Sequence, residues 1–322
     1  MNRTIVSVDV FETEYPLTKP YQLSFVSIHE FKSIGVEILL DNGKSEKAEV
    51  VPLEGYSEES YEFVLRNISD NASAVVGMSL KQARKQVLEK LKDHPFSSTA
   101  LLTAIDQFDY SLISREGAEM LETLIPFSSD QLISGEVLRE FFKVGKTYKL
   151  KLTGNQEKDI KALDMLETYY PLECTVRADA NQAYNMEEAR KLLEHICTLK
   201  VMENVEYFEQ LLPLSDWSGQ KRLVELFPDQ NFMLDEPIID NNKIDRAVDC
   251  GVQYVKLKLY KQGGIMEVLA HAQYANEKGL KVIFGNGVAS WLSNQVELTI
   301  FSTHRQFFSG VHEANGYLKI KA

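Results

Sequence analysis

ECTVRADANQAY, residues 173–184, has the form of a short buried strand that ends in a carboxylate, Asp179, and continues into a loop. The same form recurs downstream, where VEYFEQLL carries Glu209 and FMLDEPI carries Asp235, each at the end of a short apolar run. Carboxylates on neighbouring strand ends repel one another, so they need a positive charge between them. The series therefore predicts a metal site, and with it an enzyme.

A Lys-x-Lys pair lies on each side of this series, Lys149 with Lys151 upstream and Lys256 with Lys258 downstream. Side chains two residues apart on a strand point to the same face, so the members of each pair point together. From Lys151 through the three carboxylates to Lys258 the steps are 28, 30, 26 and 23 residues. Each step is about the length of one strand–helix unit, which predicts five marked strand ends in succession.

From about residue 120 onward, strand-like and helix-like segments alternate, with amphipathic stretches such as 156–170 and 186–199 between the strands. This alternation predicts an α/β fold with a parallel sheet. Eight strands are the number that closes a (β/α)8-type barrel. We expect such a barrel here, in which the first and eighth strands can depart from the regular pattern. An open doubly wound sheet would favour a glycine-rich phosphate loop after an early strand, and the sequence lacks one. The expected strands are 122–127, 146–152, 173–179, 204–210, 232–236, 252–259, 281–285 and 306–311.

The first third of the chain has a different pattern, typical of a small antiparallel sheet followed by helices. DNGK at 41–44 is a hairpin turn signal, because Asn-Gly supplies the positive backbone angles of a tight turn. The expected strands are 3–12, 25–40 and 47–53, and the expected helices are 58–70, 79–93 and 97–114.

Composition excludes several classes of function. The formal net charge of -12 over 322 residues argues against nucleic acid or an anionic membrane as a partner. The chain has no run of about 18 apolar residues that could span a membrane, and its first residues do not have the pattern of a signal peptide. Three cysteines without a CxxC pair fit a reducing compartment. We expect a cytoplasmic protein that forms homo-oligomers and acts on a small molecule.

The residue types at the strand ends point to one kind of chemistry. Oxygen ligands without His or Cys suit Mg²⁺, with Mn²⁺ as the near substitute. Such an ion beside lysines suits removal of a proton from the carbon next to a carboxylate, through an enediolate intermediate whose charge the ion and an ammonium group stabilise. Side chains next to the carboxylates are candidates for an outer shell that orients them, namely Asn181, Gln210 and Glu236.

These motifs resemble the enolase superfamily, and within it the muconate-lactonizing subgroup. That subgroup includes dipeptide epimerases, N-acylamino acid racemases and o-succinylbenzoate synthases. The resemblance extends over nearly the whole chain. In the second part it rests on YKLKLTG, RADANQAY, YFEQLLPLSDW, FMLDEP and KLKLYKQGGI, and in the first third on PLTKPYQLSF, AEVVPLEGYSEES and SSTALLTAIDQFDYSL. It implies an α+β capping domain over residues 1–118, which carries substrate-specificity loops, and a β/α barrel over residues 119–322, which carries the metal and acid/base residues.

The resemblance also implies roles for single residues. Asp179, Glu209 and Asp235 would bind the metal, and Lys151 and Lys258 would be the two acid/base lysines. Lys149 would assist as a cation near the substrate carboxylate, whereas Lys256, one pleat deeper, would be structural.

Substrate contacts depend on two lid loops, near residues 16–29 and 51–60, and on the last two strand ends. The Asp-x-Asp that dipeptide epimerases usually carry on the eighth strand is absent. Glu313 is the candidate replacement, and the other candidate contacts are Phe25, His29, Tyr56 and Asn286.

Three functions are compatible with these residues. The leading expectation is a racemase or epimerase of an amino acid derivative, in which one lysine removes the α proton and the other returns one to the opposite face. The alternative is a lyase or cycloisomerase similar to o-succinylbenzoate synthase, in which one lysine is the base and the other chiefly a cation. A catalytically silent scaffold is the third, because fold alone does not prove function.

Overall fold

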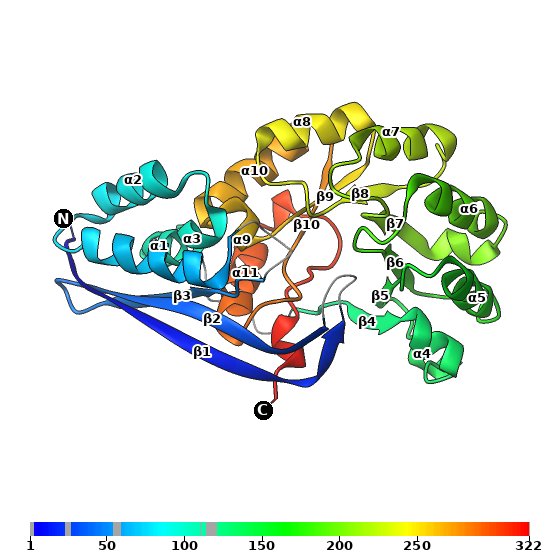
Figure 1. Ribbon diagram of the computed structural model, residues 1–322, viewed down its shortest axis with the longest axis horizontal. Coiled ribbons are helices and arrows are strands. Elements are labelled where there is room, and N and C mark those ends of the chain that lie inside the picture. The colour runs from blue at the N-terminus through cyan, green and yellow to red at the C-terminus, as the bar shows by residue number, and fades with distance from the viewer. Residues whose placement is uncertain (1–2, 23–26, 54–58, 110, 114–120, 322) are drawn as a thin grey trace. The chain divides into compact units, whose positions relative to one another are not determined.

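The computed structural model describes residues 3–22, 27–53, 59–109, 111–113 and 121–321 (Figure 1). The chain divides into two compact units. Unit 1 comprises Met1–Leu121, Leu257–Tyr274 and Ile283–Ala322, and unit 2 comprises Glu122–Lys256 and Ala275–Val282. The predicted domain boundary between residues 118 and 119 lies outside the described residues.

Unit 1 contains a three-stranded antiparallel sheet in the order β1-β2-β3. Its strands are β1 (Ile5–Gln22), β2 (Ser27–Leu40) and β3 (Ser45–Val50). The predicted turn joins β2 to β3, with Gly43 at a φ of 78° and the Asn42 side chain accepting a hydrogen bond from the Lys44 amide at 3.1 Å. The three strands and the hairpin predicted from the sequence are confirmed, although β1 is longer than expected.

The expected first lid loop, residues 16–29, is not a loop throughout. β1 continues to Gln22, and the register between β1 and β2 shifts between Pro16 and Tyr21. Proline cannot donate to a sheet ladder, which accounts for an irregularity at this place. Leu17 anchors this arm, because it is buried in a small apolar cluster with Phe31.

Three helices of unit 1 pack on the sheet: α1 (Tyr61–Ala74), α2 (Leu80–Leu91) and α3 (Pro95–Asp106). Ser60 and Ser79 accept hydrogen bonds from first-turn amides of α1 and α2, and α3 begins with proline, which a first turn tolerates. The inward residues of β2 and of all three helices form one apolar core. Later in the chain, unit 1 also contains α9 (Leu259–Gln262) and α11 (Trp291–Thr303).

A second sheet has seven strands in the order β10-β9-β8-β7-β6-β5-β4, and β4 to β9 pair in parallel. Helices alternate with the strands, and Figure 1 shows α5 to α8 along the outer side of β5 to β9. This is the predicted strand–helix alternation. The strands are β4 (Ile125–Ser128), β5 (Thr147–Lys151), β6 (Thr175–Asp179), β7 (Val205–Glu209), β8 (Phe232–Leu234), β9 (Tyr254–Leu257) and β10 (Lys281–Phe284). The helices are α4 (Ser129–Ser134), α5 (Gln156–Glu167), α6 (Met186–Ile196), α7 (Trp217–Leu226), α8 (Asn241–Cys250) and α10 (Ile265–Glu277).

The predicted eighth strand at 306–311 is wrong. Residues Arg305–Phe307 form a short 3-10 helix, and no strand follows within residues 308–311. The Arg305 guanidinium donates to the carbonyl oxygens of Phe308 and Gly310, so these carbonyls bond to a side chain rather than to a neighbouring strand. Phe308 is buried by stacking on Phe284, 4.8 Å between ring centroids. Phe308 is thus buried without sheet pairing.

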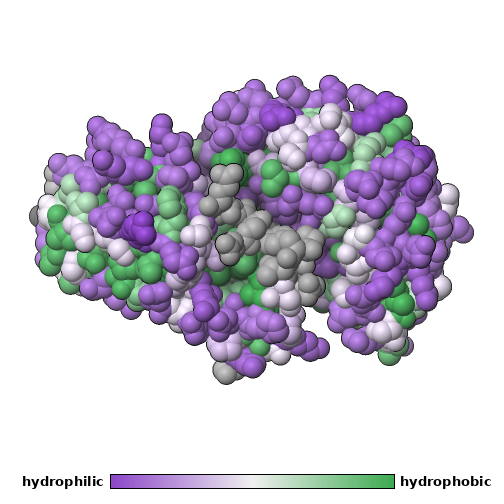
Figure 2. Space-filling model, in the orientation of Figure 1, coloured by the Kyte–Doolittle hydropathy of each residue, from purple (hydrophilic) through white to green (hydrophobic). Residues whose placement is uncertain are grey.

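Hydrophilic side chains cover most of the face shown in Figure 2, and hydrophobic ones lie there in small groups. Among the described residues, no helix is long and apolar enough to cross a membrane.

Candidate active site

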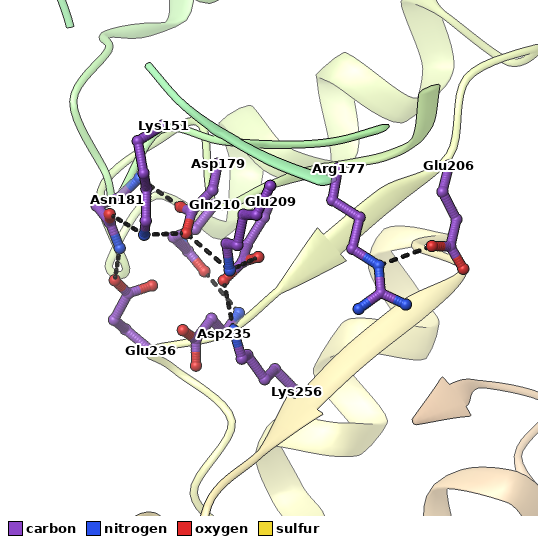
Figure 3. A network of polar contacts seen from close by, with 11 residues as sticks. Lys151, Arg177, Asp179, Asn181, Glu206, Glu209, Gln210, Asp235, Glu236 and Lys256 are labelled. Atoms are coloured by element: carbon purple, nitrogen blue, oxygen red, sulfur yellow. Dashed lines mark hydrogen bonds and ion pairs between the residues drawn. The ribbon is translucent and has the colours of Figure 1, made fainter. Parts of the chain in front are cut away.

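The predicted site residues of unit 2 lie together at the carboxyl ends of adjacent parallel strands (Figure 3). Lys151 on β5 pairs in register with Asp179 on β6, and Asp179 pairs with Glu209 on β7. Asp235 follows β8 directly. Because parallel strands end at one edge of a sheet, the regular spacing in the sequence becomes a cluster in space.

Lysine ammonium groups contact the carboxylates of Asp179 and Glu209. Lys149 Nζ lies 2.9 Å from Asp179 Oδ2 and 2.5 Å from Glu209 Oε2. Lys256 Nζ lies 3.1 Å from the other oxygen of Glu209, and Lys151 donates to Asp179. The exposed fraction of the Lys151 side chain is 21%, against 6% for Lys149 and 4% for Lys256. Lys151 is therefore the most accessible of these three lysines.

Positive charge controls the ionisation of Asp179. Burial alone would raise the pKa of its carboxyl, but the ammonium groups of Lys149, Lys151 and Lys256 more than offset burial and hold the pKa well below its usual range. Asp179 is therefore an ionised carboxylate at neutral pH.

The donor set fits a hard divalent ion. In the described part of the chain, no three His, Cys, Asp or Glu side chains are close enough to hold a metal as they stand. The Lys149 ammonium nevertheless marks a position where one positive centre meets Asp179 and Glu209, and Asp235 follows the next strand. Carboxylate oxygens arranged around a positive centre are the ligands that Mg²⁺ prefers.

A second set of polar side chains orients this cluster, as in Figure 3. Asn181 accepts a hydrogen bond from Lys151 Nζ at 2.7 Å, and its own amide group donates to Glu236 Oε1 at 3.4 Å. Gln210 Oε1 accepts the backbone N–H of Asp235 at 3.0 Å. These are the three residues that the sequence suggested for an outer shell.

Backbone conformation at the strand ends is unusual. Asn181, Gln182 and Gln210 have positive φ angles of 44°, 68° and 41°, a region that residues other than glycine rarely adopt. Such conformations cost on the order of 1–3 kcal/mol each and gather at functional sites. They lie directly after the strands that carry Asp179 and Glu209.

A buried carboxylate on α5, Asp159, fixes the loops that follow β5 and β6. It accepts hydrogen bonds from the Thr153 amide and hydroxyl and from the Gly154 amide, each at about 3.0 Å, and from the Tyr184 hydroxyl. Gly154 has a φ of 79°, and a Cβ there would lie 2.6 Å from the Cβ of Ala183. The loops beyond Lys151 and Asp179 are thus held against each other. The sequence did not reveal this role, because an aspartate in a first helical turn resembles an ordinary N-terminal charge.

Lys258 lies in unit 1, as the residue before α9, and it is buried. Its backbone amide donates to Gln262 Oε1 at 2.8 Å, and its Nζ lies 5.7 Å from the centroid of the Tyr260 ring. Lys256 lies on β9, and Lys258 follows the last residue of that strand, Leu257.

The predicted substrate contacts are placed as follows. Phe25 and Tyr56 lie outside the described residues. His29 is exposed on β2, and Glu313 is buried. Asn286 is buried and its side chain closes a turn, accepting the Val288 amide at 2.8 Å and donating to the Val288 carbonyl at 2.7 Å.

Residues 137–316 match the model of a protein family described as enolase C-terminal domain-like. Among curated proteins, an L-amino acid-D/L-Glu epimerase from Francisella philomiragia is 23% identical over 301 residues, which cover 87% of this chain and 82% of that protein.

Two solved structures illustrate the likeness in fold. A dipeptide epimerase from Enterococcus faecalis, in complex with Mg and the dipeptide L-Leu-L-Tyr, has a TM-score of 0.83 at 20% identity and covers 99% of this chain and 92% of its own. An N-succinyl Arg/Lys racemase from Bacillus cereus has a TM-score of 0.86 at 18% identity and covers 99% and 89%. The predicted fold class, a β/α barrel with an added N-terminal α+β domain, is confirmed.

Proposed function

Because the chain belongs to the enolase C-terminal domain-like family, we propose that it is an isomerase that racemises or epimerises an amino acid derivative, an N-acylamino acid or a dipeptide. The relatives named above are epimerases and a racemase of such compounds, which supports this reaction class. The observation that carries the proposal is the placement of Lys151. It lies in contact with a carboxylate cluster at a strand end and keeps part of its surface exposed.

Asp179, Glu209 and Asp235 are the proposed ligands of Mg²⁺, with Mn²⁺ as a possible substitute. When bound, the ion would stabilise the negative charge that develops on the substrate carboxylate as the α proton leaves. Lys149 and Lys256 hold Glu209 through its two oxygens, which fixes the carboxylate in one orientation. The Gln210 side chain fixes the backbone at Asp235 in the same way.

Lys151 is the proposed acid/base group on one face of the substrate. Its Nζ is held by Asp179 and by the Asn181 side-chain oxygen, so it has a fixed position from which to take or return a proton. Lys258 is the proposed partner for the opposite face. Lys149, which is more deeply buried, would stay charged beside the carboxylates and assist as a cation.

Deuterium incorporation tests this function directly. The protein would be incubated with Mg²⁺ in D₂O with a library of dipeptides and N-acylamino acids, and the α position would be followed by proton NMR. A racemase or epimerase exchanges this proton in recovered substrate and in product. Turnover without any such exchange would instead favour a lyase or cycloisomerase, which uses the same residues.

Lys151→Met should abolish the exchange, and Lys158→Met is the matched control, because Lys158 is an exposed lysine of unit 2 that pairs with Asp130. A chain that exchanges no probe and responds to neither Mg²⁺ nor Mn²⁺ would be a silent scaffold. A cytoplasmic location and a homo-oligomeric state are further proposals, which rest on the sequence alone.

A further inference from the structure

Glu297 is a buried carboxylate in unit 1 that the proposed reaction has not used. It lies on α11 with 1% of its surface exposed, in a stretch of the helix whose neighbours are also buried. Burial raises the pKa of its carboxyl to about 7. A buried carboxylate costs free energy unless hydrogen bonds and an opposite charge compensate it. The groups that contact Glu297 therefore indicate what this residue does.

The hydrogen bonds of Glu297 reach the ends of two strands. Its Oε2 accepts from the Asn294 amide group at 2.8 Å, and its carboxylate also accepts the backbone N–H groups of Leu259 and Asn286. Leu259 directly follows Lys258, and Asn286 lies just beyond β10. Asn294 reinforces the arrangement, because the same amide group donates to the Asn286 carbonyl at 3.0 Å. One side chain thus holds the backbone after both strands.

The charge that acts on Glu297 belongs to Lys258. Attraction to this lysine lowers the pKa of the glutamate and partly opposes the effect of burial. The attraction is mutual, so the carboxylate must favour the ammonium form of Lys258 by the same free energy. Lys258 is itself 3% exposed, and water therefore screens the pair only weakly.

We propose that Glu297 is a positioning residue, which fixes the backbone beside Lys258 and keeps that lysine in its ammonium form. This rests on the proposed function, in which Lys258 is one of two acid/base groups. Lys258 is prepared to donate a proton or to act as a cation, and its carboxylate partner lies on α11, whereas Lys151 has Asp179 as its partner.

Lysine NMR tests the proposal without a substrate. The full chain, labelled with ¹³Cε and ¹⁵Nζ in lysine, would be titrated in the presence of Mg²⁺, with the Lys258 signal assigned by its loss in Lys258→Arg. In Glu297→Gln the midpoint of the Lys258 titration should fall by about one pH unit, because the anion is gone. Glu297→Asp, which keeps the charge, should remain closer to the wild type.

Glu49→Gln is the matched control. Glu49 is another buried glutamate of unit 1, 4% exposed, and it accepts a hydrogen bond from the Ser33 hydroxyl at 2.8 Å. Its replacement should leave the Lys258 midpoint unchanged. A folded Glu297→Gln protein with the wild-type midpoint for Lys258 would overturn the proposal.

A reciprocal titration covers the case in which Glu297→Gln does not fold. In Lys258→Met, the glutamate keeps its hydrogen bonds but loses the cation, so its pKa should rise above the value of about 7. A ¹³Cδ-glutamate titration measures this, and an unchanged pKa would contradict the proposal. If the wild type exchanges no probe in D₂O, the proposed function fails, whereas both titrations still decide the link between Glu297 and Lys258.

Discussion

Lys256 Nζ lies 3.1 Å from Glu209 Oε1, while the other oxygen of the same carboxylate contacts Lys149. Glu209 has no exposed surface and Lys256 is 3% exposed. Two ammonium groups therefore compensate one buried carboxylate. The sequence suggested a structural role for Lys256. Its contact with Glu209 is consistent with that role, because the ammonium group offsets the cost of burying a negative charge.

Replacement of Lys256 should expose this compensation. Lys256→Met removes one of the two ammonium groups that contact Glu209, and we expect the metal-free protein to lose about 3 kcal/mol of stability, because a buried charge has lost a partner. Added Mg²⁺ should recover part of the loss by supplying positive charge. Urea denaturation with EDTA and with Mg²⁺ measures both values. Lys32→Met, which removes exposed ion pairs with Glu14 and Glu30, is the control and should cost much less, because solvent screens exposed pairs.

Metal binding should stabilise the folded chain through the three carboxylates. At a Mg²⁺ concentration about a hundredfold above the dissociation constant, the expected gain is about 2.7 kcal/mol. Thermal unfolding with and without Mg²⁺ shows it as a rise in Tm. Asp179→Asn, Glu209→Gln and Asp235→Asn should each abolish the rise, whereas Asp164→Asn on the exposed face of α5 should not. A full rise in all three variants would place the metal elsewhere.

Each acid/base lysine should be needed for turnover. Lys151→Met and Lys258→Met should each lower kcat by about 10²–10⁴-fold, the usual contribution of a general acid or base. The α-proton exchange of each epimer, followed separately, should fall most for the epimer that faces the missing lysine. Equal losses for both epimers in both variants would contradict the division of labour between the lysines.

The hydrogen bonds that Asp159 accepts from the loops after β5 and β6 should be essential to the candidate active site. Asp159 itself touches no substrate in the proposed reaction. Asp159→Ala strands four donors, among them the Tyr184 hydroxyl, and should cost about 3 kcal/mol or more. Tyr184→Phe removes one of them and should cost about 1–2 kcal/mol. In a double-mutant cycle the two losses should not add, because the residues share one interaction. Additive losses in urea denaturation would show that the hydrogen bond contributes little.

Asp106 should make unit 1 sensitive to pH. Burial raises the pKa of its carboxyl to about 6, although Arg84, 2.8 Å away, lowers it. The folded pKa lies above the unfolded one, so the folded chain holds a proton that the unfolded chain has released. Stability should therefore fall by about 3 kcal/mol as pH rises from about 4 to about 6. Asp106→Asn should remove this part of the pH dependence in urea denaturation, and an unchanged slope would refute it.

Hydrophobic runs and their polar ends were sufficient to predict seven of the eight expected barrel strands. Each of these runs pairs with a neighbour, and the parallel register then brings Lys151, Asp179 and Glu209 to one edge. The run at 306–311 also contains apolar residues, but it does not form a strand. Arg305 donates hydrogen bonds to the carbonyl oxygens of Phe308 and Gly310. The hydrogen-bond partner of a backbone carbonyl depends on the tertiary structure, so the local sequence pattern could not predict it.

The gathering of the candidate carboxylates and lysines of unit 2 was predictable, and their contacts were less so. Strand spacing indicated which carboxylates gather, but not that Lys149 bridges Asp179 and Glu209, which depends on side-chain conformation. Glu297 gave no signal, because a single glutamate in a helix usually faces water. Its place became visible only when the fold brought α11 to Leu259 and Asn286.

The left-handed residues after β6 and β7 set a limit on how this protein can be improved. Glycine at position 210 would relax a backbone held at a φ of 41°, and would also remove the side chain that receives the Asp235 amide. Selection for heat resistance alone would favour replacements that relax the backbone at Asn181, Gln182 and Gln210. Such replacements would lower activity, because they remove side chains that lie beside the candidate active site. An engineering campaign on this chain gains thermal tolerance at lower risk from surface positions on α5 to α8, away from the strand ends.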